Sequence, residues 1–80
     1  MKVPRDCNGA DLARALRRLD YEIIRQTGSH VRLTTQRGGE HHLTIPNHRP
    51  LKVGLLNSLL KEVAAHHRVS VEQLLQDLKL

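Results

Sequence analysis

His30 is the residue of this chain whose type and setting best suit chemistry. It follows Gly28 and Ser29 and opens a segment of alternating apolar and polar residues. Imidazole exchanges protons near neutral pH because its ordinary pKa is about 6.5. Arg25 and Arg32 lie close to it in the sequence, and their cations suit a phosphate group on which negative charge grows. The residues therefore predict proton transfer beside a phosphate. An ordinary exposed strand histidine is the alternative that chemistry alone leaves open.

The other histidines have spacings that argue against a metal site. His41 and His42 are adjacent in a predicted strand, so their rings point to opposite faces. His66 and His67 lie about 100° apart around a predicted helix, and we interpret them as exposed residues that suit the negative end of its dipole. Cys7 is the single cysteine, and no His-Glu-x-x-His pattern occurs. We therefore predict neither a metal nor another cofactor.

RNA cleavage makes fewer demands than the other hydrolytic chemistries. Ser29 is a weak candidate nucleophile, because side chains of neighbouring strand residues diverge and no elbow motif surrounds it. No Walker-type glycine loop is present, so nucleotide hydrolysis is unsupported. In RNA the ribose 2′-OH already lies beside the phosphate, and a protein needs only to move protons and stabilise charge.

The charge balance favours a polyanionic partner. Lys and Arg total 13 against 8 for Asp and Glu, which gives a net charge of +5. Such an excess promotes binding through phosphate contacts, although a protein that is merely basic fits the same numbers. Tyr21 is the only aromatic residue, which argues against modules that stack bases on aromatic rings.

The length of the chain predicts one domain over residues 1–80. The cysteine content and the N-terminal segment predict a cytoplasmic protein. Eighty residues suffice for one domain with a small core. A single cysteine allows no intrachain disulfide, as is usual in a reducing compartment. No apolar stretch follows the segment Met1 to Asp6, so we expect neither a signal peptide nor a membrane span.

The periodicity predicts an α+β fold: an antiparallel three-stranded sheet with helices on one face. The expected elements are helices over Asn8–Leu19, Val53–His66 and from Ser70 onward, and strands over Tyr21–Gln26, His30–Thr35 and Glu40–Ile45. Asn8 is the expected N-cap of the first helix, and Ser70 with Gln73 forms a capping box at the start of the last one. A turn at Thr27-Gly28 would set Arg25 opposite His30. The open face would carry His30, Arg32, Thr34, His42 and Thr44. The basic face of the first helix, with Arg14, Arg17 and Arg18, is either solvated or contacts RNA or an acidic partner.

Several segments together resemble the HicA (YcfA-like) toxin family. They are Leu16–Tyr21, Arg25–His30, Leu43–His48 and Leu51–Leu56. The most specific part is Arg-Gln-x-Gly-Ser-His followed by an alternating strand and Pro-x-His, and the resemblance runs from about Gly9 to Leu78. This chain has Leu55 where the family usually has a threonine that suits a helix cap, and Asp20 where the family has glycine.

This resemblance implies a fold like the double-stranded RNA-binding domain, in the order α-β-β-β-α with a short extra C-terminal helix. It implies cleavage of mRNA with His30 as the catalytic acid–base group. The expected RNA contacts are Arg25, Gly28, Ser29, Arg32, Arg37, His42, His48 and Lys52, with His42 and His48 as candidates for the second proton transfer. It also implies a HicB-type antitoxin that covers the active face, with operator DNA bound only through the antitoxin. The alternative is a non-catalytic RNA-binding or antitoxin-binding domain of the same fold.

Overall fold

The computed structural model describes residue 4 and residues 6–80. The prediction that no signal peptide is present rests partly on residues 1–3 and 5, which lie outside the described residues. The described elements are α1 (Gly9–Leu16), the 3-10 turn η1 (Arg17–Leu19), β1 (Glu22–Thr27), β2 (His30–Thr35), β3 (His41–Pro46), α2 (Val53–His67) and α3 (Val71–Leu78). Within the described ranges, no helix is both long and apolar enough to cross a membrane.

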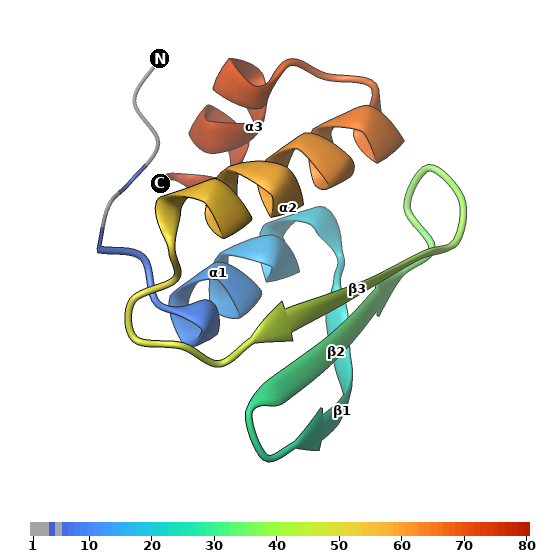
Figure 1. Ribbon diagram of the computed structural model, residues 1–80. Coiled ribbons are helices and arrows are strands. Elements are labelled where there is room, and N and C mark those ends of the chain that lie inside the picture. Colours follow the sequence, from blue (N-terminus) through green and yellow to red (C-terminus); the bar gives the residue numbers. More distant parts are fainter. Residues whose placement is uncertain (1–3, 5) are drawn as a thin grey trace.

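The three strands form one antiparallel sheet in the order β1-β2-β3. All three helices lie on one side of this sheet, and its other face is open (Figure 1). The predicted α+β class and the α-β-β-β-α order are therefore confirmed, together with the additional C-terminal helix.

Local interactions explain where α1 begins and where η1 ends. The backbone N–H of Asn8 donates a hydrogen bond to the Asp11 carboxylate at 3.2 Å, in the predicted N-cap position. A Cβ atom at Gly9 would collide with the carbonyl oxygen of Pro46, so glycine allows α1 to start against the end of β3. Asp20 follows η1 with φ of 64°, a left-handed conformation that aspartate tolerates better than most residues.

The β1–β2 hairpin has a different register from the predicted one. Its turn is Gly28-Ser29 rather than Thr27-Gly28, so Thr27 pairs with His30 and Arg25 pairs with Arg32. The expected pairing of Arg25 with His30 is wrong. Gly28 takes φ of 50°, which glycine adopts at little cost. A bulge between Ile23 and Arg25 then shifts the strand, so Ile23 and Arg25 are on opposite faces. Arg25 still lies on the same face as His30, as predicted.

The core lies between the helices and the two strands β2 and β3. Its fully buried side chains include Leu12, Leu16, Leu33, Ile45, Leu56, Leu60, Leu74 and Leu78. At the end of β2, the buried Thr35 hydroxyl donates a hydrogen bond to the Leu19 carbonyl at 3.1 Å and accepts one from the Arg37 N–H at 3.1 Å. Every residue of β1 is exposed, so β1 contributes hydrogen bonds to the sheet but no buried side chain.

The helical half agrees with the periodicity of the sequence. α2 begins at Val53 as predicted, and Leu55 packs against the core. The Ser70 hydroxyl accepts a hydrogen bond from the Gln73 N–H at 3.0 Å, which confirms the predicted cap of the last helix.

Truncation of Leu16 tests this description of the core. Leu16 is 0% exposed, so Leu16→Ala should lower the free energy of unfolding by about 2–5 kcal/mol through lost burial and a residual cavity. The matched control is Leu80→Ala, because Leu80 is 38% exposed and its truncation should change stability by less than about 0.5 kcal/mol. Urea denaturation measures both, and similar losses in the two variants would contradict the assignment of the core.

Candidate nucleic-acid interface

His30 occupies the first position of β2, where the hairpin turn enters the central strand. It pairs with Thr27 on one side and with Pro46 on the other, so its backbone is fixed from both sides. The Ser29 hydroxyl lies 3.4 Å from the Nδ1 atom of His30. Ser29 belongs to the turn rather than to a strand, which is why its side chain does not diverge from His30 as the sequence had suggested.

A shallow hollow of about 200 Å³ lies in front of His30 on the open face of the sheet. It is lined by Arg25, Thr27, His30, Arg32 and Thr44. None of these residues is acidic, and the two guanidinium groups come from paired positions on β1 and β2. Guanidinium groups bind phosphate oxygens through two parallel hydrogen bonds. The hollow therefore has the composition of a phosphate site beside a titratable imidazole.

The loop after β3 lies against the same end of the sheet. The Asn47 N–H donates a hydrogen bond to the Ser29 carbonyl at 2.6 Å, and the His48 carbonyl accepts one from the Gly9 N–H at 3.1 Å. Both His48 and Lys52 are exposed. Lys52 is the N-cap residue of α2, where free backbone N–H groups and the helix dipole favour an anion. Gly28 and Ser29 thus form the turn beside His30, and the loop that carries His48 is tied to that turn, whereas Lys52 lies further along the chain at the start of α2.

The remaining predicted RNA contacts, Arg37 and His42, lie away from this hollow. Arg37 is in the β2–β3 loop, 3.5 Å from the Asp20 carboxylate. His42 is on the open face as predicted, but it pairs with Thr34 and lies 3.2 Å from the Glu40 carboxylate. Thr34 is four residues from His30 along β2, which corresponds to about 13 Å. The sequence correctly predicted that His42 lies on the open face, but it did not predict the distance between His42 and His30.

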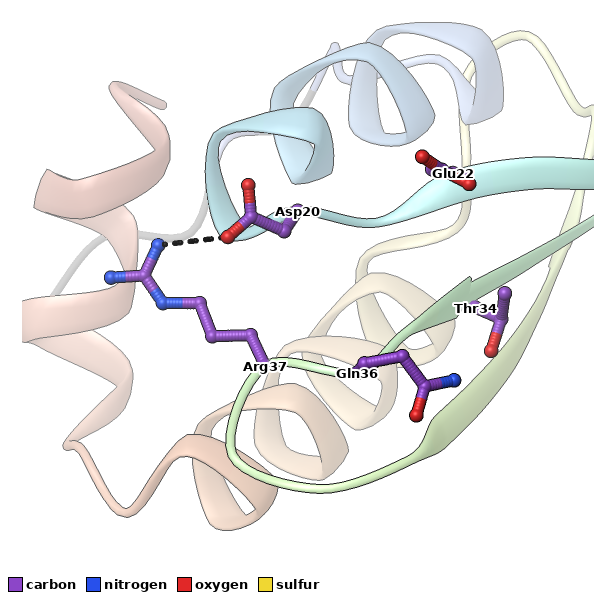
Figure 2. Close-up of a pocket in the computed structure, with 5 residues that line it drawn as sticks. All are labelled: Asp20, Glu22, Thr34, Gln36 and Arg37. Carbon is purple, nitrogen blue, oxygen red and sulfur yellow. Dashed lines mark ion pairs between the residues drawn. The ribbon is translucent and has the colours of Figure 1, made fainter.

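A larger hollow of about 460 Å³ lies near Arg37 but is a poorer phosphate site. Figure 2 shows its lining: Asp20 after η1, Glu22 at the start of β1, Thr34 on β2, and Gln36 and Arg37 in the following loop. The Arg37 side chain points to Asp20 and forms the ion pair drawn there. Two carboxylates against one paired cation disfavour a polyanion. Composition, rather than size, therefore favours the hollow at His30.

Three other histidines form a hydrogen-bonded cluster that the sequence did not predict. The Tyr21 hydroxyl lies 2.7 Å from Nδ1 of His41 and 3.2 Å from Nε2 of His67, and Nε2 of His41 lies 3.1 Å from the Glu62 carboxylate. Every group is satisfied when His67 donates to Tyr21, Tyr21 donates to His41, and His41 donates to Glu62. Burial and the Glu62 charge raise the pKa of Tyr21 to about 12, so its hydroxyl remains a donor at neutral pH.

His66 extends this cluster to the β2–β3 loop. Its Nε2–H donates to the carbonyl oxygens of Arg37 and Gly39, both at 3.1 Å, and its ring stacks on His41 at 4.5 Å. The interpretation of His66 and His67 as simply exposed residues is therefore wrong, since both are half-buried and hydrogen-bonded. The His-His pair at the helix end gave no local signal of this, because the partners come from distant segments of the chain.

Across the described part of the chain, no group of three or more His, Cys, Asp or Glu side chains is arranged to hold a metal ion. The rings of the histidine cluster are directed at Tyr21, at Glu62 and at loop carbonyls instead. Its chemistry is that of a structural hydrogen-bond network that joins the β2–β3 loop to the end of α2.

This network predicts that stability depends on pH. Burial, and then the nearby His66, Arg37 and His41, lower the pKa of His67 below its ordinary value of 6.5. Protonation is therefore less favourable in the folded than in the unfolded chain. The contribution of neutral His67 to the free energy of unfolding is complete above pH 6.5 and is lost as the pH falls through the lowered pKa.

The free energy of unfolding should thus decrease between pH 7.5 and pH 5 in urea titrations, and His67→Gln should weaken that dependence. His48→Gln is the matched control, because His48 is exposed and its replacement should leave the dependence unchanged. Equal pH dependence in the wild type and His67→Gln would show that His67 is not responsible.

Comparison with known families gives one finding for this chain. A family model described as the HicA toxin of bacterial toxin–antitoxin systems matches residues 9–64. The matched span covers α1, the whole sheet and most of α2, and so includes both His30 and the loop that holds His48. No curated protein and no solved structure matches the chain.

Proposed function

Because the chain belongs to the HicA toxin family, and is therefore the toxin of a toxin–antitoxin system with a cognate antitoxin, we propose that it is a metal-independent endoribonuclease that cleaves mRNA in the cytoplasm. The observation that carries this proposal is the hollow in which His30 lies with Arg25 and Arg32 and without an acidic residue. That combination provides a proton carrier beside a cationic phosphate site.

The reaction is an internal transfer within the RNA strand. A base removes the proton of the ribose 2′-OH, the 2′ oxygen forms a bond to phosphorus, and the bond from phosphorus to the 5′ oxygen of the next nucleotide breaks. That 5′ oxygen takes up a proton, so the products are a 2′,3′-cyclic phosphate and a 5′-hydroxyl. Arg25 and Arg32 stabilise the charge that grows on the phosphate oxygens, and His30 carries a proton in one or both steps.

The turn supports His30 in this role. The Ser29 hydroxyl, 3.4 Å from Nδ1 of His30, limits rotation of the ring and leaves Nε2 to exchange protons with RNA. Gly28 provides the positive φ that closes the turn and presents a backbone without a side chain to the strand of RNA.

His48 fits the second proton-transfer role better than His42. The residue before His48 donates its N–H to the Ser29 carbonyl at 2.6 Å, so the loop of His48 is tied directly to the turn beside His30. His42 pairs with Thr34 further along the sheet and has Glu40 at 3.2 Å. We assign His42 and Arg37 to contacts with RNA beyond the cleaved phosphate, and Lys52 to a neighbouring phosphate at the start of α2.

Replacement of His30 is the direct test. His30→Ala should reduce the rate of RNA cleavage by about 10²–10⁴ and should melt near the wild-type temperature, because His30 is exposed. Cleavage of a labelled mRNA fragment measures the rate. His42→Ala is the matched control on the same face and should retain most activity, whereas His48→Ala should lose more. A fully active His30→Ala, or a wild type that binds RNA without cutting it, would support the non-catalytic alternative.

Product chemistry provides a second, independent test. Cleavage by the wild type should continue in excess EDTA, because the proposed steps use only side chains and the 2′-OH. The products should end in 2′,3′-cyclic phosphate or 3′-phosphate, and an RNA with a single 2′-deoxy substitution at the cleavage site should resist. A 3′-hydroxyl product that disappears with EDTA would indicate a metal-assisted mechanism instead.

The proposed partner of the open face is a HicB-type antitoxin. A cationic hollow with an active imidazole needs a stoichiometric block while the toxin is stored, and a neutral or acidic surface complements it. In this proposal the antitoxin also carries the contact to operator DNA, so the toxin joins that complex indirectly.

A further inference from the structure

Strand β1 is left uncovered by the rest of the fold. All of its residues are exposed, although Ile23 pairs with the buried Leu33 and therefore lies on the helix side of the sheet. Ile23 is 49% exposed and Ile24 is 50% exposed. Among the strands that the structure describes, β1 is also an edge strand, since it pairs with β2 alone. Exposed isoleucines beside an unpaired strand edge are a feature that proteins otherwise avoid.

A groove of about 240 Å³ runs between this strand and α1. Its lining combines the apolar side chains of Ala13, Ile23 and Val31 with the guanidinium-bearing side chains of Arg14 and Arg17, together with Ala10, Gln26 and Asn47. Arg14 has one weak ion pair, to Asp11 at 3.8 Å, and both groups are largely exposed. Within residues 6–80, Arg17 forms no ion pair. The groove is thus apolar at its base and cationic at its rim.

From these features we propose that the groove, with the free edge of β1, binds an extended segment of the cognate antitoxin in which apolar and acidic residues are interspersed. Such a segment would add a fourth strand beside β1 through backbone hydrogen bonds. An apolar side chain would cover Ile23 and fill the groove, and carboxylates would pair with Arg14 and Arg17. The proposal rests on membership of the toxin family and extends the proposed function to a second contact surface.

A protein partner fits this surface better than RNA. RNA binding by the chain relies on phosphate contacts and gains nothing from two half-exposed isoleucines, whereas burial of apolar side chains drives protein association. The pattern of cations around an apolar base favours a partner with carboxylates flanking an apolar residue. Arg14 and Arg17 are thereby assigned to an acidic partner rather than to solvent, whereas Arg18 does not line the groove.

The groove and the catalytic hollow share no lining residue. Affinity for the antitoxin can therefore be weakened without a change in RNA cleavage. Such a variant would remain an active toxin that its antitoxin neutralises poorly. If the antitoxin contacted only the face that carries His30, changes in the groove would not have this effect.

The test uses the toxin and its purified cognate antitoxin. The groove variants are Ile23→Ser and the double variant Arg14→Glu/Arg17→Glu, and calorimetry measures their affinity for the antitoxin. We expect each to bind at least about tenfold more weakly, the loss that corresponds to about 1.4 kcal/mol. Their cleavage of RNA without antitoxin should stay within about twofold of the wild type.

Two matched controls separate the groove from general effects of charge and surface. Arg18→Glu reverses a neighbouring exposed arginine that does not line the groove, and Leu80→Ser removes an exposed apolar side chain at the other end of the chain. Both should bind the antitoxin as the wild type does. Hydrogen exchange of the unmodified complex provides a readout that needs no variant: amides of Glu22–Thr27 should gain protection when the antitoxin binds.

Wild-type affinity in both groove variants, or unchanged exchange over β1, would overturn the proposal. An equal loss of RNA affinity and antitoxin affinity in Arg14→Glu/Arg17→Glu would mean that the groove holds RNA instead. A wild type that fails to cleave RNA would refute the proposed nuclease, but the calorimetry and hydrogen exchange would still decide whether the groove binds the antitoxin.

Discussion

The strict alternation of β2 is the constraint on which the rest of the structure depends. β2 is the central strand, so hydrogen bonds from both neighbours hold its backbone. Val31, Leu33 and Thr35 are buried under the helices, and successive side chains of a strand point to opposite faces. Burial of one set therefore forces His30 and Arg32 onto the open face. The apolar residues that stabilise the fold are the same ones that orient the candidate chemistry.

The helices cover β2 and β3 but leave β1 as a support for the open face. β1 contributes Arg25 to the candidate site, because the pairing of Arg25 with Arg32 brings its side chain into the hollow of His30. The bulge at Ile24 separates the two functions of the strand, since it leaves Arg25 on the open face and turns Ile23 to the helix side. One irregularity in one strand thus produces both the cationic hollow and the uncovered groove for which we propose an antitoxin segment.

The histidines differ in function because their surroundings differ. His30 is exposed beside two arginines, in a position suited to proton exchange with a ligand. His41, His66 and His67 are half-buried and hydrogen-bonded to Tyr21, Glu62 and loop carbonyls, and they join the β2–β3 loop to α2. Such a network adds rigidity only while its members keep their hydrogen-bond partners. The candidate site therefore lies on the open face, whereas the network that we expect to make stability depend on pH lies on the helix side.

The sequence by itself determined the element order, the faces of β2 and β3, the caps at Asn8 and Ser70, and His30 as the candidate acid–base group. These features follow from periodicity and from short motifs, which are local properties of the chain. Only the tertiary structure decided the hairpin register, because a turn shifted by one residue and a compensating bulge leave the same apolar pattern. Likewise, the contacts of Tyr21 with His41 and His67 join segments far apart in sequence, and the exposure of β1 depends on which strands the helices cover. Packing between distant elements sets both the contacts of Tyr21 and the exposure of β1, and no local sequence pattern encodes that packing.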